Sequence, residues 1–279
     1  MKHKDKNNIA ASVRQRLINL SKQRGEDPNL VFIRYAIERF LYRICHYGQS
    51  DRFILKGAML FATWAGKPHR PTKDLDLMGF GDASADKLRE IFRRICETEV
   101  EPDGLEFNPD SIQITEIREQ LEYPGRRIRL ESRLGNARIN IQIDVGFGDS
   151  IIPEPSEIEY PTLLDMPAPH IRAYPAETVV AEKLESMVSL GMLNSRMKDF
   201  YDLRIMAKEM DFDGKTLTEA IKATFSRRGT AISGEKPVAL TEDFSADADK
   251  QTQWQAFLRM SSLENVKLEL PEVIDQIGK

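Results

Sequence analysis

Two aspartates two positions apart, Asp74 and Asp76, form the first pattern in this chain that could do chemistry. They alternate with Leu75 and Leu77, and a period of two is typical of a β-strand with one apolar and one polar face. Both carboxylates would leave such a strand on the same face, where a cation would relieve their repulsion. Paired carboxylate oxygens suit a hard divalent ion such as Mg²⁺. The alternative is a solvated strand edge that binds nothing.

A third carboxylate, Asp144, lies in a second alternating segment, residues 137–147. Isoleucines and a valine alternate there with polar residues, so Asp144 should leave the strand opposite the apolar row. If this strand pairs with that of Asp74, three carboxylates could surround one or two divalent ions. Such sets serve phosphoryl and nucleotidyl transfer, in which the ions activate the attacking hydroxyl and neutralise the triphosphate.

A glycine turn precedes the aspartate pair. Residues 52–55 predict a short strand and residues 58–64 a short helix, with Lys56 and Gly57 between them. Backbone N–H groups at such a turn can face a phosphate, and a residue without a side chain lets the phosphate come close. The order of strand, glycine turn, helix and Asp-x-Asp strand therefore favours a nucleoside triphosphate site.

The elements that must position these residues follow an α, then mixed α/β, then α order. Apolar residues three or four apart predict helices, and alternation predicts strands. The predicted helices are 9–24, 28–47, 85–97, 176–190, 197–210, 216–225 and 251–260, and the further strands are 111–119, 126–134 and 137–147. Residues 135–136 (Gly-Asn) predict a tight hairpin, and residues 229–250 predict a polar loop or lid.

Prolines indicate how the chain divides. Six of the 14 prolines lie within residues 153–175, which predicts an extended connector. The expected division is an N-terminal lobe of residues 1–152, opened by two helices over 9–47, then the Pro-rich connector 153–175 and a helical C-terminal lobe of residues 176–279.

Composition limits the class of protein. The chain has 279 residues, 40 basic and 44 acidic, and 41% are hydrophobic, which is typical of a globular protein. Its apolar runs fall far short of the roughly 18 residues that span a bilayer, and no apolar stretch follows the basic N-terminus as in a secretory signal. Cys45 and Cys96 lack metal-ligand spacing. These features predict a cytoplasmic protein. Because the chain is net acidic, it could bind nucleic acid only through a local basic patch.

The motifs resemble those of a known family. Lys56-Gly57-Ala58-Met59-Leu60-Phe61, followed by Arg70-Pro71-Thr72-Lys73-Asp74-Leu75-Asp76-Leu77, resembles the first motif of the polymerase-β-like nucleotidyltransferase superfamily. It is more narrowly similar to the AbiEii/MenT toxins of bacterial toxin–antitoxin and phage-defence systems. The resemblance implies an α/β (α+β) fold, with a mixed sheet in the nucleotidyltransferase lobe and a mostly helical C-terminal lobe. Ala58 replaces the usual Ser or Gly, so it offers the phosphate a backbone N–H but no hydroxyl.

The resemblance extends to about Met210 and implies further site residues. Lys183 matches a family lysine that would contact the triphosphate, although the family's aspartate three positions earlier is absent. Arg196, Lys198 and Asp199 match an Arg-x-Lys-Asp motif: the two cations would bind nucleotide, and Asp199 would act in the active site by holding Lys183 or Arg196. Asp202, one turn later, would support them. From spacing alone, Lys183 could instead cover the core with its aliphatic stem. Asp199 could likewise have no role beyond capping the N-terminus of a helix.

The implied reaction moves a nucleoside monophosphate from an NTP to an acceptor and releases pyrophosphate, with Mg²⁺ or Mn²⁺ as cofactor. Asp74, Asp76 and Asp144 would bind the metal, or Asp144 would be the base for the acceptor hydroxyl. MenT-type relatives modify the 3′ end of tRNA, so a tRNA acceptor and a block of translation are expected. The protein partner would be a cognate antitoxin.

Several alternatives stay open. The acceptor could be a protein or a small molecule, or the chain could be an inactive module that binds RNA or a partner. An Asp-x-Asp phosphatase is a rival, but it expects a hydroxyl residue where Met78 stands. An arginine cluster could follow RNA phosphates or merely balance nearby acids; its members are Arg126, Arg127, Arg129, Arg133 and Arg138.

Overall fold

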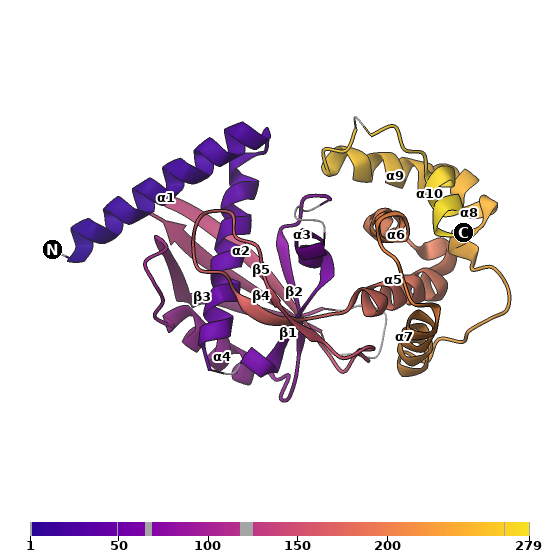
Figure 1. Cartoon of the computed structure of the whole chain (residues 1–279), viewed down its shortest axis with the longest axis horizontal. Coiled ribbons are helices and arrows are strands. Elements are labelled where there is room, and N and C mark those ends of the chain that lie inside the picture. Colours follow the sequence, from indigo (N-terminus) through magenta and orange to yellow (C-terminus); the bar gives the residue numbers. More distant parts are fainter. Residues whose placement is uncertain (1, 49, 65–68, 118–124, 265, 279) are drawn as a thin grey trace. The chain divides into compact units, whose positions relative to one another are not determined.

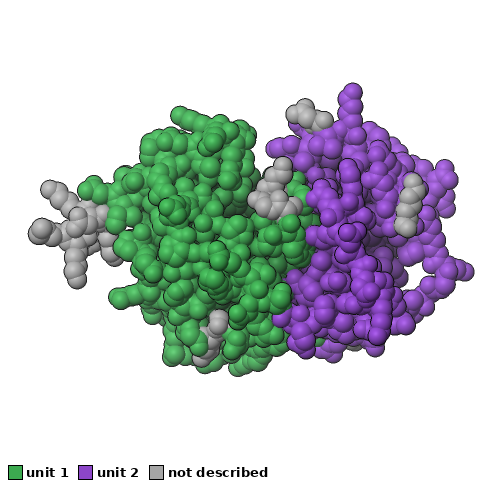
Figure 2. Space-filling model, in the orientation of Figure 1, with its two compact units in different colours: residues 1–148, 156–173 green, residues 149–155, 174–279 purple. Residues whose placement is uncertain are grey.

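A computed structural model describes residues 2–48, 50–64, 69–117, 125–264 and 266–278. The chain forms two compact units (Figure 2). Unit 1 comprises Met1–Gly148 and Ser156–Ala173, and unit 2 comprises Asp149–Pro155 and Tyr174–Lys279. Most of the segment expected to be a connector, residues 153–175, thus lies in unit 1.

In the part of unit 1 that the structure describes, seven strands form one mixed sheet in the order β3-β4-β5-β2-β1-β7-β6; Figure 1 labels β1 to β5. The pairs β2–β5 and β1–β7 are parallel and the others antiparallel. The strands are β1 (Phe53–Lys56), β2 (Asp74–Gly79), β3 (Leu105–Ile117), β4 (Gly125–Leu134), β5 (Ala137–Phe147), β6 (Ser156–Glu159) and β7 (His170–Ala173). The predicted mixed α/β fold is confirmed, while β6 and β7 replace part of the expected connector. The predicted strand 111–119 begins earlier, and its last two residues lie outside the described residues.

Helices cover the apolar face of this sheet. The helical elements of unit 1 are α1 (Lys2–Arg24), α2 (Pro28–His46), η1 (Ser50–Arg52), η2 (Gly57–Leu60), α3 (Phe61–Trp64) and α4 (Ala85–Glu97). Helix α2 lies against β5 and α4 against β3 (Figure 1). Phe40 of α2 and Phe92 of α4 stack with ring centroids 5.9 Å apart, and Phe107 of β3 packs edge-on against Phe40. Because side chains alternate along the strands, the polar residues of β2 and β5 occupy the other face of the sheet.

Unit 2 is built from helices. They are α5 (Ala176–Leu190), η3 (Gly191–Leu193), α6 (Met197–Glu209), α7 (Gly214–Arg227), η4 (Val238–Leu240), α8 (Glu242–Ala246), α9 (Ala248–Met260) and α10 (Leu270–Ile277). Residues 229–250, expected to be a loop or lid, contain η4, α8 and the start of α9. They also supply core: Phe244 is fully buried and stacks on Phe200 at 5.2 Å. Within the described ranges, no helix has the length and apolarity to cross a membrane.

A buried acid in unit 1 predicts a pH-dependent stability. Glu38 on α2 is 1% exposed, and its Oε2 accepts a hydrogen bond from the backbone N–H of Leu163 at 2.7 Å. Burial raises the pKa of Glu38 from 4.5 to about 7. The folded state thus holds this proton more tightly than the unfolded chain, so stability is lost as pH rises from 4.5 to 7. At about 1.4 kcal/mol per pH unit, the loss is of order 3 kcal/mol.

The variant Glu38→Gln keeps an oxygen for the Leu163 N–H but cannot ionise. We expect urea unfolding to show that the wild type loses free energy of unfolding between pH 5 and pH 7.5, and that the variant loses distinctly less. Equal slopes for the two proteins would contradict this assignment.

Candidate functional site

The sheet brings the three predicted carboxylates of unit 1 to one face. Strands β2 and β5 are parallel, with Asp76 opposite Asp144 and Asp74 opposite Gln142. Residues in register on neighbouring strands point to the same face, and so do residues two apart on one strand. Leu75 and Leu77 point the other way and are fully buried. Asp74, Asp76 and Asp144 therefore share the polar face, as their spacing predicts.

Two cations extend this arrangement into a row across four strands. Lys56 of β1 is in register with Asp76, and Arg127 of β4 with Asp144, which gives the order Arg127, Asp144, Asp76, Lys56. Arg127 forms a two-bond fork with Asp144: its Nε donates to Oδ1 at 2.9 Å and its Nη2 to Oδ2 at 2.7 Å. The hydrogen bond to Asp144 raises the pKa of Arg127, and the charges of Asp144, Asp74 and Asp76 add to the shift. We call these residues and Asp74 the charged row.

The donor set of the charged row fits a divalent ion at Asp74 and Asp76. Mg²⁺ in proteins commonly takes one or two carboxylates and completes its shell with substrate phosphates and water. Among the described residues, no group of three or more His, Cys, Asp or Glu side chains could hold a metal ion as they now lie, so the set of three ligands stays a prediction. In this structure both oxygens of Asp144 accept hydrogen bonds from Arg127.

Gly57 lies directly against Asp76. Its φ is +76°, and a Cβ built there would be 2.2 Å from Oδ2 of Asp76 and 2.8 Å from the Asp76 Cβ. A side chain would therefore meet both backbone strain and a clash that Asp76 could relieve only by moving. Close approach of a phosphate is the reason for glycine predicted from the sequence. The structure adds a second reason, the close approach of Asp76. Ala58 follows and is buried.

Replacing Gly57 by alanine should displace the Asp76 carboxylate. We expect Gly57→Ala to lower the free energy of unfolding by about 1–3 kcal/mol. If Asp76 holds a divalent ion, the variant should also bind Mn²⁺ at least tenfold more weakly, because the carboxylate is displaced. Gly25→Ala is the matched control: Gly25 has φ +65° but open space within 4 Å of the added Cβ. The control should lose stability through backbone strain but bind Mn²⁺ as the wild type does, and equally weakened Mn²⁺ binding in both variants would contradict the close approach of Gly57 and Asp76 as the cause.

In unit 2, the predicted residues of α5 and α6 form one ion-pair cluster. Lys183 Nζ donates to Asp199 Oδ1 at 2.6 Å and to Asp202 Oδ2 at 2.9 Å, and Arg196 Nε donates to Asp199 Oδ2 at 2.6 Å. Asp199 is 1% exposed. Burial would raise its pKa, but the charges of Lys183 and Arg196 prevail and hold it well below the usual range. Asp199 thus contacts both cations, which goes beyond the alternative of a simple helix cap.

Two residues that the sequence argument missed hold the turn before this cluster. Asn194 is fully buried, and its Oδ1 accepts the backbone N–H of Arg196 at 2.8 Å. Lys250 of α9, also buried, donates from Nζ to the Asn194 carbonyl at 3.1 Å. Lys250 lies in the segment expected to be a loop or lid, so no pattern pointed to it. Lys198, which matches the family motif, is exposed.

The arginine cluster of β4 and β5 is largely neutralised by neighbouring acids. Arg126 pairs with Glu116 at 2.7 Å, and Arg127 with Asp144. Arg133 and Arg138 both pair with Glu131, which is 6% exposed. Arg129 is exposed and forms no ion pair within the described part of the chain. These contacts favour the alternative that the cluster balances nearby acids.

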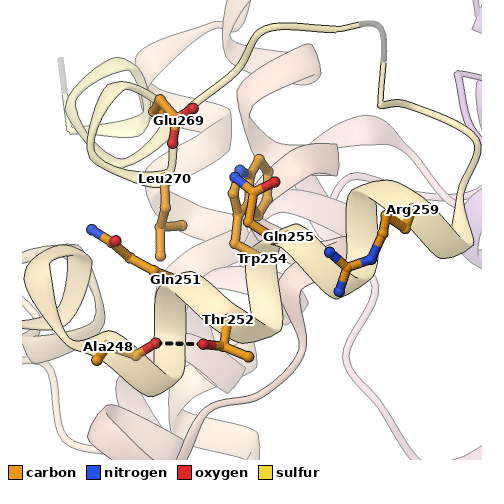
Figure 3. Close-up of a pocket in the computed structure, with 8 residues that line it drawn as sticks. All are labelled: Ala248, Gln251, Thr252, Trp254, Gln255, Arg259, Glu269 and Leu270. Carbon is orange, nitrogen blue, oxygen red and sulfur yellow. Dashed lines mark hydrogen bonds between the residues drawn. The ribbon is translucent and has the colours of Figure 1, made fainter.

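A separate cavity of about 370 Å³ lies beside α9 and the start of α10 in unit 2 (Figure 3). Its lining residues are Ala248, Gln251, Thr252, Trp254, Gln255, Arg259, Glu269 and Leu270. None of the predicted site residues lines it, so the charged row and the cluster at Lys183 remain the candidates for chemistry.

Comparison with known proteins finds one family model and two solved structures that are similar to this chain. The sequence model described as "Nucleotidyl transferase AbiEii toxin, Type IV TA system" matches residues 39–274. A crystal structure described as that of a candidate nucleotidyltransferase from H. pylori is similar in fold, with a TM-score of 0.52 and 17% identity over 88% of this chain and 92% of that chain. JHP933 from Helicobacter pylori is similar to the same degree, with a TM-score of 0.51 and 17% identity over 88% and 89% of the chains. No curated protein matches the chain.

Proposed function

The chain belongs to the AbiEii family of nucleotidyltransferase toxins of type IV toxin–antitoxin systems, and on that premise we propose that it transfers a nucleoside monophosphate from an NTP to the 3′ end of tRNA. The observation that carries the proposal is the placement of Asp74 and Asp76 on one polar sheet face, against the turn at Gly57. Modification of the tRNA acceptor end would block aminoacylation and hence translation. Proteins and small molecules are the alternative acceptors.

The reaction assigns a role to each part of the charged row. The acceptor hydroxyl oxygen forms a bond to the α-phosphorus, the bond from that phosphorus to the bridging oxygen breaks, and pyrophosphate leaves. Asp74 and Asp76 would hold Mg²⁺ or Mn²⁺, which when bound would neutralise phosphate charge and make the hydroxyl more acidic. Asp144 would take the hydroxyl proton, and the backbone from Lys56 to Ala58 would bind phosphate.

Unit 2 takes its role from the family motif. Lys183, Arg196 and Lys198 would bind the nucleotide phosphates as cations, and Asp199 and Asp202 would fix Lys183. Since both carboxylates already bond Lys183 at 2.6 and 2.9 Å, the ammonium is held in one place before any nucleotide arrives. A preorganised charge costs no reordering during the reaction.

The direct test incubates the protein with each labelled NTP in turn, together with Mg²⁺ and total tRNA. We expect label in tRNA with at least one NTP and none with EDTA. tRNA whose terminal ribose has been oxidised by periodate lacks the acceptor hydroxyls and is the matched control, so it should stay unlabelled. Label in no macromolecule, or in oxidised and intact tRNA alike, would contradict the tRNA assignment.

The toxin role has its own test in cells. Induced expression in bacteria should arrest growth and incorporation of labelled amino acids, in keeping with a cytoplasmic site of action. Co-expression of the protein encoded beside it should relieve the arrest if that protein is the cognate antitoxin. The phage-defence role implied by the family would appear as fewer plaques when both proteins are present.

A further inference from the structure

The charged row contains its own counter-ion on the Asp144 side. The Arg127 guanidinium bonds both oxygens of Asp144, and the Arg127 side chain is only 34% exposed and that of Asp144 17%. A fork of two parallel bonds fixes the plane of the carboxylate as well as its charge. Asp144 is therefore turned toward Arg127, although its backbone is in register with Asp76.

A divalent ion at Asp74 and Asp76 would meet Arg127 as a competitor in two ways. The positive guanidinium repels an approaching cation, because both act on the same row of carboxylates. To recruit Asp144, the ion would also have to break two charge-assisted hydrogen bonds. We propose that Arg127 is a positioning residue that keeps Asp144 off the metal and weakens divalent-ion binding in the absence of nucleotide, an inference that rests on the proposed function.

A second arginine on this face of β4, Arg129, is not in register with a carboxylate. Arg129 lies on β4 two residues from Arg127 and so on the same face, in register with Gln142 rather than with a carboxylate. It is exposed, and in the described ranges it makes no ion pair. Arg129 can thus serve as a matched control, because its removal takes the same charge from the same strand and face without freeing Asp144.

The test measures Mn²⁺ binding to the full chain without nucleotide, by titration calorimetry and by the loss of the free-ion EPR signal. Arg127→Gln and Arg127→Met each remove the charge, and we expect each to tighten Kd about tenfold, as the loss of one cation near a divalent site predicts. Arg127→Lys keeps the charge but cannot form the fork, so its Kd should lie between that of the wild type and that of Arg127→Gln. Arg129→Gln should change Kd by less than twofold.

Two outcomes separate this inference from the proposed function. If Asp74→Asn/Asp76→Asn leaves Mn²⁺ binding unchanged, the metal site of the proposed function is wrong. If that double variant abolishes binding but Arg127→Gln and Arg127→Met bind Mn²⁺ no more tightly than the wild type, the inference about Arg127 is overturned and the proposed function stands. Tighter binding in Arg127→Lys and Arg129→Gln equal to that in Arg127→Gln would overturn it as well.

Discussion

Replacing Asp74 and Asp76 together by asparagine should lower nucleotide transfer at least a thousandfold and abolish toxicity. Asparagine keeps the size and shape of each side chain but removes both charges that could hold a divalent ion. Metal-assisted charge neutralisation contributes several kcal/mol to phosphoryl-transfer transition states, and about 4 kcal/mol corresponds to a thousandfold in rate. The measurement is the initial rate of label transfer to tRNA at saturating NTP and Mg²⁺.

The double variant should fold as well as the wild type, because repulsion between the two carboxylates disappears with their charges. Asp51→Asn/Asp86→Asn is the matched control, since both of these carboxylates are exposed on unit 1 and the charge change is the same. The control should keep full activity. If Asp74→Asn/Asp76→Asn stays toxic and still binds RNA, the chain is a binding module and not an enzyme of this kind.

The local part of the charged row can be predicted from the sequence. Alternation along residues 74–78 and 137–147 places each carboxylate on the polar face, and both strands form as expected. The hairpin at residues 135–136 carries more information: it pairs Leu134 with Ala137, and counting outward from that pair brings Arg127 opposite Asp144. A two-residue turn sets the register of both strands. The pairing of Arg127 with Asp144 could thus have been predicted from the sequence. The spacing of the aspartates predicted only a metal site.

The pairing of strands that are distant in the sequence could not be predicted in the same way. That Asp144 lies beside Asp76 depends on the parallel pairing of β2 and β5, which no turn sets because some sixty residues separate the two strands. The same holds for β7, which joins β1 in parallel from within a Pro-rich segment that looked like a connector. Short strands flanked by prolines have little pattern of their own, so only the sheet reveals them.

Helix α10 could have been predicted from the sequence but was not. Leu270, Val273 and Ile274 are three and four apart, follow a helical period and are buried. This pattern was readable in the sequence, and Pro271 suits the first turn of a helix. The predicted helices end at residue 260 and so omit α10, although the family model extends to residue 274.

Replacing Lys183 by methionine should lower the free energy of unfolding of unit 2 by about 3–5 kcal/mol. Methionine keeps the apolar stem but removes the ammonium that bonds Asp199 and Asp202, both at most 2% exposed. Loss of one partner of a buried ion pair costs far more than the pair itself contributes, because a desolvated charge is left behind. Urea unfolding at pH 7, followed by far-UV circular dichroism, measures the change.

The pH dependence identifies the cause. The folded-state pKa of Asp199 lies below its unfolded value, so its ion pairs contribute stability above about pH 4, and that contribution is lost as pH falls. The gap in stability between the wild type and Lys183→Met should therefore be widest at neutral pH and narrow toward pH 3. A gap that is independent of pH would contradict the electrostatic origin and indicate lost packing instead.

Lys198→Met is the control that separates stability from catalysis. Lys198 belongs to the same motif but is exposed, so its loss should leave the free energy of unfolding within about 0.5 kcal/mol of the wild type. If Lys198→Met binds NTP more weakly at full stability, the motif binds phosphate. Lys183→Met should then also lose activity, for two reasons: a lost phosphate contact and a destabilised unit 2. Activity assays without urea, at a temperature where both variants stay folded, distinguish the two causes. Under these conditions only the lost phosphate contact lowers the activity of Lys183→Met.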